Sequence, residues 1–480
     1  MFLGIDIGTS GVKAVIVAQD GKVLATGNAP LNVSRPFPLW SEQDPQDWWQ
    51  ATEAAILALP DDLRAGVQGI GLAGQMHGAT LLGADHKPLR PAILWNDGRS
   101  FQLCRKLEEE IPESRAITGN LAMPGFTAPK LMWVREHEPE VFDRVHKVLL
   151  PKDYVRLCMT GEMASDLSDS AGTLWLDVGA RDWSDVMLAA TGLSRQHMPV
   201  LFEGNGITGV LRPEVAARWG MAAVPVAAGG GDNAAGAAGI GVVNEGDALL
   251  SLGTSGVIFV ATSAFRPNPD GAVHAFCHCL PAMWHQMSVH LSAASCIDWG
   301  VKAVGADGPA DFFALAQEAG SGVGPELFLP YLSGERTPHN DSHIRGAVLG
   351  IDNETDRRRI AAAVLEGVAF AHADGIAVLR QAGTTIEELA VIGGGARSRY
   401  WGSIISAALN VRLAYLEGGE VGPALGAAKL ALMAVTGASA AEACTRPSIS
   451  DVIEPDAALA DRLAPRLARF RAAYSALKSL

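Results

Sequence analysis

The chain has 480 residues, of which 48% are hydrophobic, and its 38 basic and 52 acidic side chains give a formal net charge of −14. This length suits two or three domains with cores of their own. The acidic balance, without a basic stripe, argues against nucleic acid or an anionic membrane surface as a partner.

Cysteine use and the N-terminal residues indicate the compartment. The six cysteines are scattered and form no disulfide framework. Met1 leads directly into an apolar strand, so we expect no signal peptide and a cytoplasmic location. The longest weakly polar run, 222–243, is interrupted by glycines, Pro225 and Asp232, so no membrane span is expected.

The N-terminal residues alternate short apolar strands with turns. Strands are predicted at 3–7, 12–18 and 23–27, followed by a helix that Asp44 is expected to cap. A buried strand is predicted at 67–73. Strands that alternate with helices in this way are typical of an α/β layered fold.

The turn at 8–11 reads Gly-Thr-Ser-Gly between two apolar strands, and the same four residues recur at 253–256. Glycine lets backbone N–H groups approach an anion, and the hydroxyls add further donors. One copy alone is usually an ordinary β-hairpin. The repeat so far along the chain predicts two homologous domains that hold a polyphosphate between them.

Three glycines at 229–231 separate a predicted strand, 224–227, from Asp232 and an Ala/Gly-rich helix. Asp232 could simply be the N-cap of that helix, a common role for aspartate. Three glycines, however, give more backbone freedom than a cap needs. A carboxylate at a strand end that faces a polyphosphate suits a general base, kept ionised by the helix N-terminus.

A domain boundary is predicted near 243–247, which gives domains 1–243 and 244–480. The second half repeats the order of the first, with hairpin strands at 248–260 and a helix at 292–304. This repetition supports a duplicated architecture.

The C-terminal part holds a further glycine turn and two helices. The turn at 393–395 lies between a strand and a helix, where we expect the adenosine of ATP. The small-residue helix at 423–430 matches the helix after Asp232, and a close crossing of the two helices would serve as a hinge or be plain tight packing. The last segment, 457–478, is predicted to be an amphipathic helix that Pro465 breaks or restarts.

These signals follow one another as phosphate hairpin, small-residue helix, phosphate hairpin, adenosine turn and small-residue helix. The order resembles the sugar kinase, heat-shock ATPase and actin superfamily. That resemblance implies an α/β fold of two duplicated actin-like, ribonuclease H-like domains with a cleft and hinge between them. Within it the chain resembles the FGGY carbohydrate kinases over essentially its whole length. Residues 125–134 and 346–366 are similar to the two family signatures, although Arg359 stands where an acid, amide or histidine is usual.

Three shorter motifs, at 75–78, 95–99 and 331–339, are similar to those of the bacterial xylulokinases within this family. The resemblance implies ATP-dependent phosphorylation of D-xylulose to D-xylulose 5-phosphate. Two alternatives stay open. One is another FGGY kinase that acts on ribulose, gluconate, glycerol or a polyol. The other is an actin-like or chaperone-like ATPase without a sugar substrate.

The motifs and the resemblance together predict the site residues. Asp232 is expected to be the general base, and Asp6 to hold the Mg²⁺ of Mg-ATP through water. The expected sugar contacts are Met76, His77, Trp95, Asp97 and Asn233. The expected nucleotide contacts are Thr9, Ser10 and Lys13 in the first hairpin, Gly253 and Thr254 in the second, and Gly394, Gly395 and Ala396 in the third glycine turn. A lone histidine such as His77 is more often structural, but its place at a strand end before glycine favours a sugar contact.

One cluster of possible metal ligands is not interpreted as a site. It comprises Cys277, Cys279, His274, His278, His285 and His290. Their spacing matches no tetrahedral zinc pattern, and the alternation of the segment predicts paired strands. The partner that the kinase resemblance implies is a small-molecule sugar. A homodimer is left open.

Overall fold

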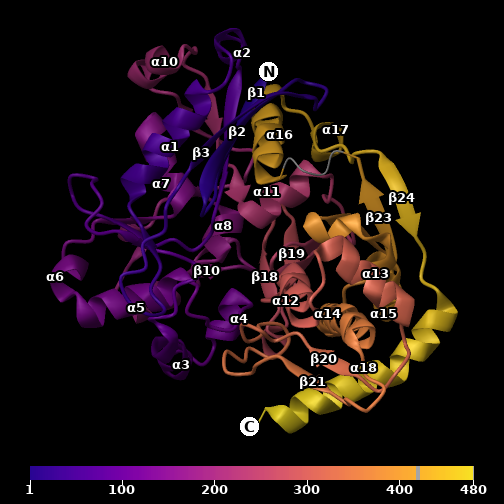
Figure 1. The fold of residues 1–480 in the computed structure, drawn as a ribbon. Helices are drawn as coiled ribbons and strands as arrows, with labels where there is room; N and C mark the ends of the chain where they lie inside the picture. Colours follow the sequence, from indigo (N-terminus) through magenta and orange to yellow (C-terminus); the bar gives the residue numbers. More distant parts are fainter. Residues whose placement is uncertain (418–421, 479–480) are drawn as a thin grey trace.

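The protein was analysed as a computed structural model that describes residues 1–417 and 422–478. Two seven-stranded sheets form its centre, one in each half of the chain (Figure 1). The first sheet runs in the order β13 (Ile207–Val210), β14 (Pro225–Ala227), β5 (Gly69–Gly74), β1 (Phe2–Ile7), β2 (Gly11–Val17) and β3 (Val23–Pro30), with β15 (Gly230–Gly231) paired to β5. The second runs in the order β18 (His274–Cys277), β19 (Trp284–His290), β17 (Gly256–Thr262), β16 (Ala248–Leu252), β22 (Glu388–Ile392), β23 (Arg412–Leu416) and β24 (Ile449–Ile453).

The two sheets share a topology. In the first, β1, β2 and β3 are antiparallel, and β5 lies parallel to β1 on its other side. In the second, β16, β17 and β19 are antiparallel, and β22 lies parallel to β16. Each Gly-Thr-Ser-Gly turn therefore joins the two equivalent central strands of its sheet. The predicted duplication of an α/β domain is confirmed.

Helices and short strand pairs surround both sheets. The helices of the first half are α1 (Pro45–Leu57), α2 (Asp61–Ala65), α3 (Phe101–Glu110), α4 (Ser114–Thr118), α5 (Thr127–His137), α6 (Pro139–Phe142), α7 (Pro151–Thr160), α8 (Leu167–Ala171), α9 (Asp185–Ala190), α10 (Pro213–Trp219) and α11 (Asp232–Gly239). Those of the second half are α12 (Ala294–Val304), α13 (Pro309–Ala319), α14 (Arg357–Gln381), α15 (Arg399–Leu409), α16 (Gly422–Thr436), α17 (Ala440–Ala443) and α18 (Ala457–Leu477). The short pairs are β4 (Glu42–Gln43) with β7 (Ala92–Ile93), β6 (Thr80–Leu82) with β8 (Lys147–Leu149), β9 (Ala164–Asp166) with β12 (Val200–Phe202), β10 (Leu176–Asp177) with β11 (Asp182–Trp183), and β20 (Leu327–Leu329) with β21 (Ala347–Leu349).

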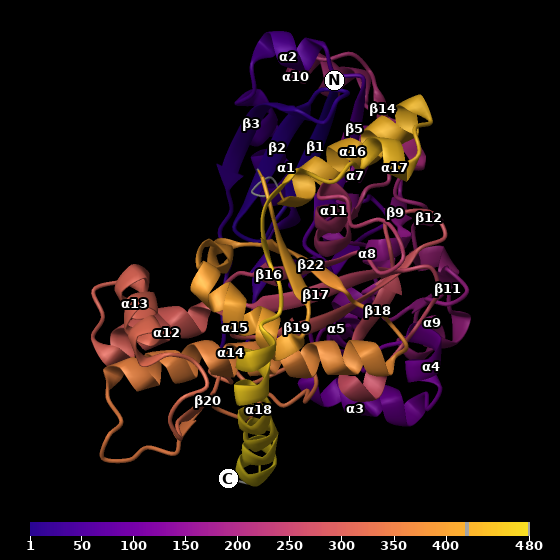
Figure 2. The ribbon, with the colours of Figure 1, turned by 90° about the vertical axis from the view of Figure 1, so that its right-hand side faces the viewer.

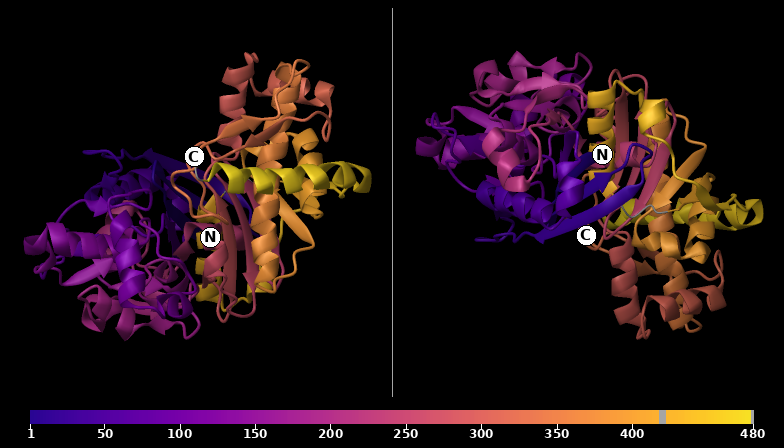
Figure 3. Two further views of the ribbon diagram at one scale, coloured as in Figure 1. Left: turned by 90° about the horizontal axis from the view of Figure 1, so that it is seen from below. Right: turned by 90° about the horizontal axis from the view of Figure 1, so that it is seen from above.

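The two halves lie side by side as separate masses when the molecule is viewed from below or above (Figure 3). Helix α16 departs from this division, because it comes from the second half but packs against β1 and β5 of the first sheet (Figure 2). A Cβ atom at Gly4 or Gly71 would lie 1.9 Å from a carbonyl oxygen of α16. Glycine at these strand positions is what lets the helix backbone come so close.

Helices α11 and α16 cross with their backbones in contact, as their small residues predict. A Cβ atom at Gly426 would lie 1.7 Å from the carbonyl oxygen of Ala235. No side chain larger than hydrogen fits there without a shift of one helix. The crossing is confirmed; its use as a hinge stays a prediction.

One expectation about the helices is wrong. Helix α18 runs unbroken through Pro465, because Leu463 and Phe470 are buried on either side of it and Arg466 donates to the Glu326 carbonyl at 2.6 Å. Packing on both sides thus outweighs one lost helical hydrogen bond. Among the described residues one helix, α14, is long and apolar enough to cross a membrane, and 94% of its apolar window is buried inside the molecule.

The cysteine and histidine segment forms paired strands, as expected. His274 to Cys277 pair with Trp284 to Met287 in antiparallel register. All six cysteines are free, and residues 1–417 and 422–478 contain no group of three or more ligating side chains arranged to hold a metal ion.

Candidate active site

The first hairpin places a carboxylate and an amine on neighbouring strands. Asp6 on β1 pairs with Lys13 on β2, and the Gly8 amide closes the turn on the Gly11 carbonyl at 3.0 Å. The Oδ1 atom of Asp6 is buried and has no hydrogen-bond partner within the described residues. A buried, unpaired carboxylate oxygen is costly unless a ligand or ion completes it.

The hydroxyls of this turn differ in their surroundings. Thr9 Oγ1 donates to Gln75 Oε1 at 2.9 Å and accepts from Trp95 Nε1 at 2.9 Å. Ser10 is exposed. The Thr9 hydroxyl therefore ties the phosphate turn to the loop that follows β5, while Ser10 stays available to a ligand.

Asp232 is the first residue of α11, and Gly231 is the N-cap. The simple interpretation of Asp232 as an N-cap is therefore wrong. The amide N and the Nδ2 atom of Asn233 both donate to Asp232 Oδ1, at 2.7 and 2.9 Å. Burial raises the pKa of Asp232 to about 6, although these hydrogen bonds oppose the shift. Both hydrogen bonds fall on one carboxylate oxygen, Oδ1.

Asp6 and Asp232 lie close enough to influence each other. Burial raises the pKa of Asp6 to about 7, the negative charge of Asp232 adds to the rise, and Lys13 opposes it. Two carboxylates from separate elements of the first half thus meet at one end of the first sheet. Carboxylate oxygens are the ligands that Mg²⁺ prefers, so the free Asp6 oxygen fits the expected metal.

A small hollow lies beside this carboxylate pair. It is lined by His77, Trp95, Met123, Gly125, Phe126, His274 and Arg336. Met76, the neighbour of His77, connects the hollow to the base: a Cβ atom at Gly231 would lie 3.0 Å from the Met76 side chain. Of the expected sugar contacts, the structure therefore brings Met76, His77 and Trp95 together next to Asp232.

His77 is held in one tautomer by its surroundings. Its Nδ1 atom lies 2.6 Å from the Gly172 carbonyl oxygen, so Nδ1 carries the proton and donates it. Burial, with the nearby Lys130 charge, lowers the pKa of His77 to about 3. The ring is neutral at physiological pH, and its Nε2 atom is a hydrogen-bond acceptor suited to a sugar hydroxyl.

Asp97 is not brought into the hollow. Its carboxylate is buried and accepts from the Ser41 amide at 2.6 Å and from the Arg99 side chain at 2.7 and 2.9 Å. Its lone pairs are occupied within the protein, so the expected direct sugar contact does not agree with this geometry. Asp97 shapes the loop that presents Trp95.

Two lining residues, His274 and Arg336, come from the second half and were not expected at the sugar site. Arg336 Nη1 lies 3.4 Å from His274 Nε2, and the His274 ring stacks on Phe276 with centroids 5.5 Å apart. Arg336 belongs to the 331–339 motif, and His274 to the cluster set aside as paired strands. The 331–339 motif was the sequence signal that could have placed Arg336 at this hollow. Nothing in the sequence distinguishes His274 from the other histidines.

The expected nucleotide side is an open cavity of about 880 Å³ in the second half. Its lining includes Gly393, Gly394 and Ala396, where the chain forms a short 3₁₀ turn (Gly394–Arg397), together with Ser251 and Tyr415. Gly393 has φ of +91°, which only glycine adopts easily.

Three predicted nucleotide residues lie beside this cavity and do not line it. A Cβ atom at Gly395 would point toward Leu252 and Trp401, 2.8 Å from each. The carbonyls of Gly253 and Thr254 accept from the Ala294 and Ala293 amides at 2.9 Å, which fixes the second turn to the start of α12. The phosphate contacts expected of Gly253 and Thr254 stay a prediction.

Comparison with family models identifies the chain. Residues 1–239 match the N-terminal domain, and residues 248–435 the C-terminal domain, of the FGGY family of carbohydrate kinases. The chain belongs to this family. Its fold, with two duplicated domains, is the one that structures of such kinases show.

Individual relatives match over the full length. A xylulose kinase of Escherichia coli is 54% identical over 482 residues, and one of Klebsiella pneumoniae 53% over 483, each covering 100% of both chains. A crystal structure from Brucella ovis, described as a xyloylose kinase, superposes with a TM-score of 0.95 at 52% identity and covers 100% of this chain and 99% of that one. The resemblance to this family and subfamily inferred from the sequence is confirmed.

Proposed function

We propose that the protein phosphorylates D-xylulose at its terminal hydroxyl with ATP, producing D-xylulose 5-phosphate and ADP. The observation that carries the proposal is the contact between the hollow and the base. The Met76–His77 loop that shapes the hollow packs against Gly231, directly before Asp232. The full-length relatives with xylulose kinase activity in their names support this substrate.

In the proposed reaction, the terminal hydroxyl oxygen of the sugar forms a bond to the γ-phosphorus of ATP. The bond from that phosphorus to the β–γ bridging oxygen breaks, and its electron pair leaves with ADP. Asp232 accepts the hydroxyl proton, which its raised pKa of about 6 favours without preventing ionisation at neutral pH.

The remaining residues bind and orient. His77 Nε2 accepts from a sugar hydroxyl, while Trp95 covers the sugar and Arg336 donates to its oxygens from the second half. Asp6 holds Mg²⁺, whose charge would neutralise the phosphates. Ser10, Lys13, Gly253 and Thr254 bind phosphates from the two hairpins, and Asn233 keeps the Asp232 carboxylate in place.

The two halves are proposed to act as domains, 1–243 and 244–480, that close over the sugar. His77 and Arg336 line the same hollow from different halves, so a sugar bound there would contact both domains. Closure would also exclude water and limit ATP hydrolysis without sugar. The free cysteines agree with the proposed cytoplasmic location.

A sugar panel tests the function. The purified protein is assayed for ADP release from Mg-ATP with D-xylulose, D-ribulose, gluconate, glycerol and no sugar. D-Xylulose is expected to give the highest kcat/KM, with little turnover when no sugar is added. Equal turnover with and without sugar would indicate an ATPase, and a preference for another acceptor would reassign the substrate.

A further inference from the structure

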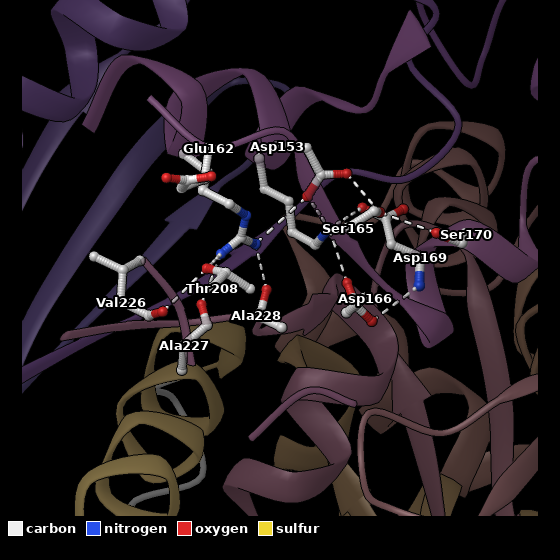
Figure 4. A network of polar contacts seen from close by, with 12 residues as sticks. Asp153, Glu162, Ser165, Asp166, Asp169, Ser170, Thr208, Val226, Ala227 and Ala228 are labelled. Atoms are coloured by element: carbon white, nitrogen blue, oxygen red, sulfur yellow. Dashed lines mark hydrogen bonds and ion pairs between the residues drawn. The ribbon is translucent and has the colours of Figure 1, made fainter. Parts of the chain in front are cut away.

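A buried network of charged side chains, with Asp153, Asp166 and Asp169 among its members, lies near Ala227 and Ala228 (Figure 4). Lys152 Nζ contacts Asp153 Oδ1 at 2.7 Å, Asp166 Oδ1 at 2.8 Å and Asp169 Oδ2 at 3.0 Å. Arg156 Nη2 lies 3.4 Å from Asp153 Oδ1. All five side chains have an exposed fraction of 0%.

The charges of this network balance only if one carboxyl carries a proton. Burial raises the pKa of Asp169 well above its ordinary value. Burial disfavours the Lys152 ammonium, but the three carboxylates outweigh it and raise its pKa. The three carboxyl groups outnumber the two cations, and the raised pKa of Asp169 reduces this excess of negative charge in the interior.

Stability alone is a weak reason for such a network, because well-packed apolar side chains of the same volume often stabilise a core as well or better. The hydrogen bonds that leave the network point to another role. Arg156 Nη1 donates to the Ala227 carbonyl at 2.8 Å, and Nη2 donates to the Ala228 carbonyl. Ala227 ends β14, and Ala228 follows it immediately before the three glycines.

A second set of hydrogen bonds from the network runs through α8 to the other end of the glycine run. Asp166 caps this helix by accepting from the Ser168 and Asp169 amides at 2.8 and 3.2 Å, and it also accepts from the Ser168 hydroxyl. Ser168 Oγ in turn accepts from the Gly231 amide at 3.0 Å. The glycine run is thus held at both ends by side chains of one network.

The glycine run needs external support. Gly229 has φ of +82°, and the run has no side chains to pack. Helix α8 also leads to Gly172, whose carbonyl orients His77. One buried unit therefore contacts both the base loop and the sugar loop.

We propose that this network is a positioning device for catalysis: Arg156 and Ser168 hold the two ends of the glycine run, so that Asp232 is presented to the sugar hydroxyl in one fixed orientation. The inference rests on the proposed function. Ser168 and Arg156 touch no substrate in it and act only through the loop.

The test is Ser168→Ala, with Ser170→Ala as the matched control. Ser170 is also fully buried on α8, but its hydroxyl donates to Ser165 Oγ at 3.0 Å, whereas Ser168 Oγ accepts from the Gly231 amide of the base loop. Ser168→Ala is expected to lower kcat for D-xylulose phosphorylation between about tenfold and a hundredfold, as a displaced catalytic group does. The KM values for both substrates and the melting temperature are expected to match those of Ser170→Ala.

A double variant separates this inference from the proposed function. If Ser168 acts through Asp232, Ser168→Ala has no further effect in an Asp232→Asn background. Equal kcat for Ser168→Ala and Ser170→Ala, or an undiminished effect in that background, overturns the positioning role while Asp232 remains the base. Wild-type turnover of Asp232→Asn alone overturns the proposed function instead.

Arg156→Lys provides a second, independent measurement should Ser168→Ala not fold. Lysine keeps the charge but lacks the forked donors that reach two carbonyls at once. It is expected to lower kcat in the same range with KM unchanged. A full-length Arg156→Lys protein with wild-type kcat contradicts the inference.

Discussion

The turn between β1 and β2 and the turn between β16 and β17 share a sequence and a place in their sheets, but within residues 1–417 and 422–478 only the first lies beside two carboxylates. Asp6 stands two residues before Gly8, and Ser251 stands two residues before Gly253. Asp6 lies near Asp232, whereas Ser251 lines the cavity expected for the nucleotide. In the proposed function both turns bind phosphate, and the side chain two residues before each turn distinguishes the proposed metal site from the proposed nucleotide site.

The comparison also explains why the first turn is electrostatically strained. A carboxylate at the Asp6 position is buried near a second carboxylate, and its pKa is raised to about 7. No such group occupies the equivalent place in the second turn. The strain is what a bound cation would relieve, so the asymmetry between the turns is functional in this account.

The largest effect is expected from Asp232→Asn. Loss of a general base typically lowers the rate by about 10² to 10⁴. Calorimetry is expected to show nearly unchanged binding of ATP and D-xylulose, since the amide keeps the size and the Asn233 contact. Near-normal turnover in the folded variant would mean that the first half does not supply the base.

Asp6→Asn and Ser251→Ala test the two turns directly. Asp6→Asn is expected to remove most Mg²⁺-dependent activity, while Ser251→Ala changes only the KM for ATP, by a few fold. Mg²⁺ titrations of both variants measure this difference. Similar titrations for the two would show that Asp6 supports only the turn.

The same Asp6→Asn variant should be more stable without ligands. Because the pKa of Asp6 in the folded state, about 7, exceeds its ordinary value of 3.8, the ionised carboxylate destabilises the fold. This cost in stability is fully present above pH 7 and disappears as the pH falls from about 7 to 3.8. A higher melting temperature is therefore expected for Asp6→Asn at pH 8, but not at pH 4; no gain at pH 8 would contradict the raised pKa.

The helix crossing between the two halves gives a prediction about stability. Gly426→Ala forces a Cβ atom against the Ala235 carbonyl and should destabilise the protein by about 1–3 kcal/mol. Gly236→Ala on the partner helix is the control, because among the described residues its Cβ atom would meet only Pro423, at 3.9 Å. That variant should gain about 0.5–1 kcal/mol from helix propensity. Equal denaturation midpoints would contradict the close crossing.

The smallest effect concerns pH. Rates should fall below about pH 6, because Asp232 must be ionised to accept a proton and its pKa is about 6. At low Mg²⁺ a second loss should begin near pH 7, as protonation of Asp6 competes with the metal. Raising Mg²⁺ should shift this upper transition to lower pH and leave the lower one in place. A pH–rate profile that does not change with Mg²⁺ concentration would show that Asp6 does not hold the metal.

Local patterns were sufficient for much of the fold and for the central residues. The Gly-Thr-Ser-Gly repeat predicts the paired hairpins, and the glycine run before Asp232 predicts the base loop. Small residues likewise predict the crossing at Gly426. These features depend on residues close together in the sequence.

What depends on distant contacts could not be predicted. His274 and Arg336 reach the hollow only because the halves meet there. Asp97 appears in a suggestive motif, but its oxygens are occupied by Ser41 and Arg99. Pro465 stays helical because of packing from other elements. The buried network has no periodic or spacing signal, since its charges come from α7, β9 and α8.

A structure of the protein with D-xylulose, Mg²⁺ and a non-hydrolysable ATP analogue tests the central claim most directly. The account predicts the terminal sugar hydroxyl within about 2.6–3.2 Å of the Asp232 carboxylate. It also predicts the γ-phosphate between the two Gly-Thr-Ser-Gly turns and the cation on the Asp6 side. A sugar bound away from His77 and Asp232, or a cation held at the second turn, would contradict the different roles proposed for the two Gly-Thr-Ser-Gly turns.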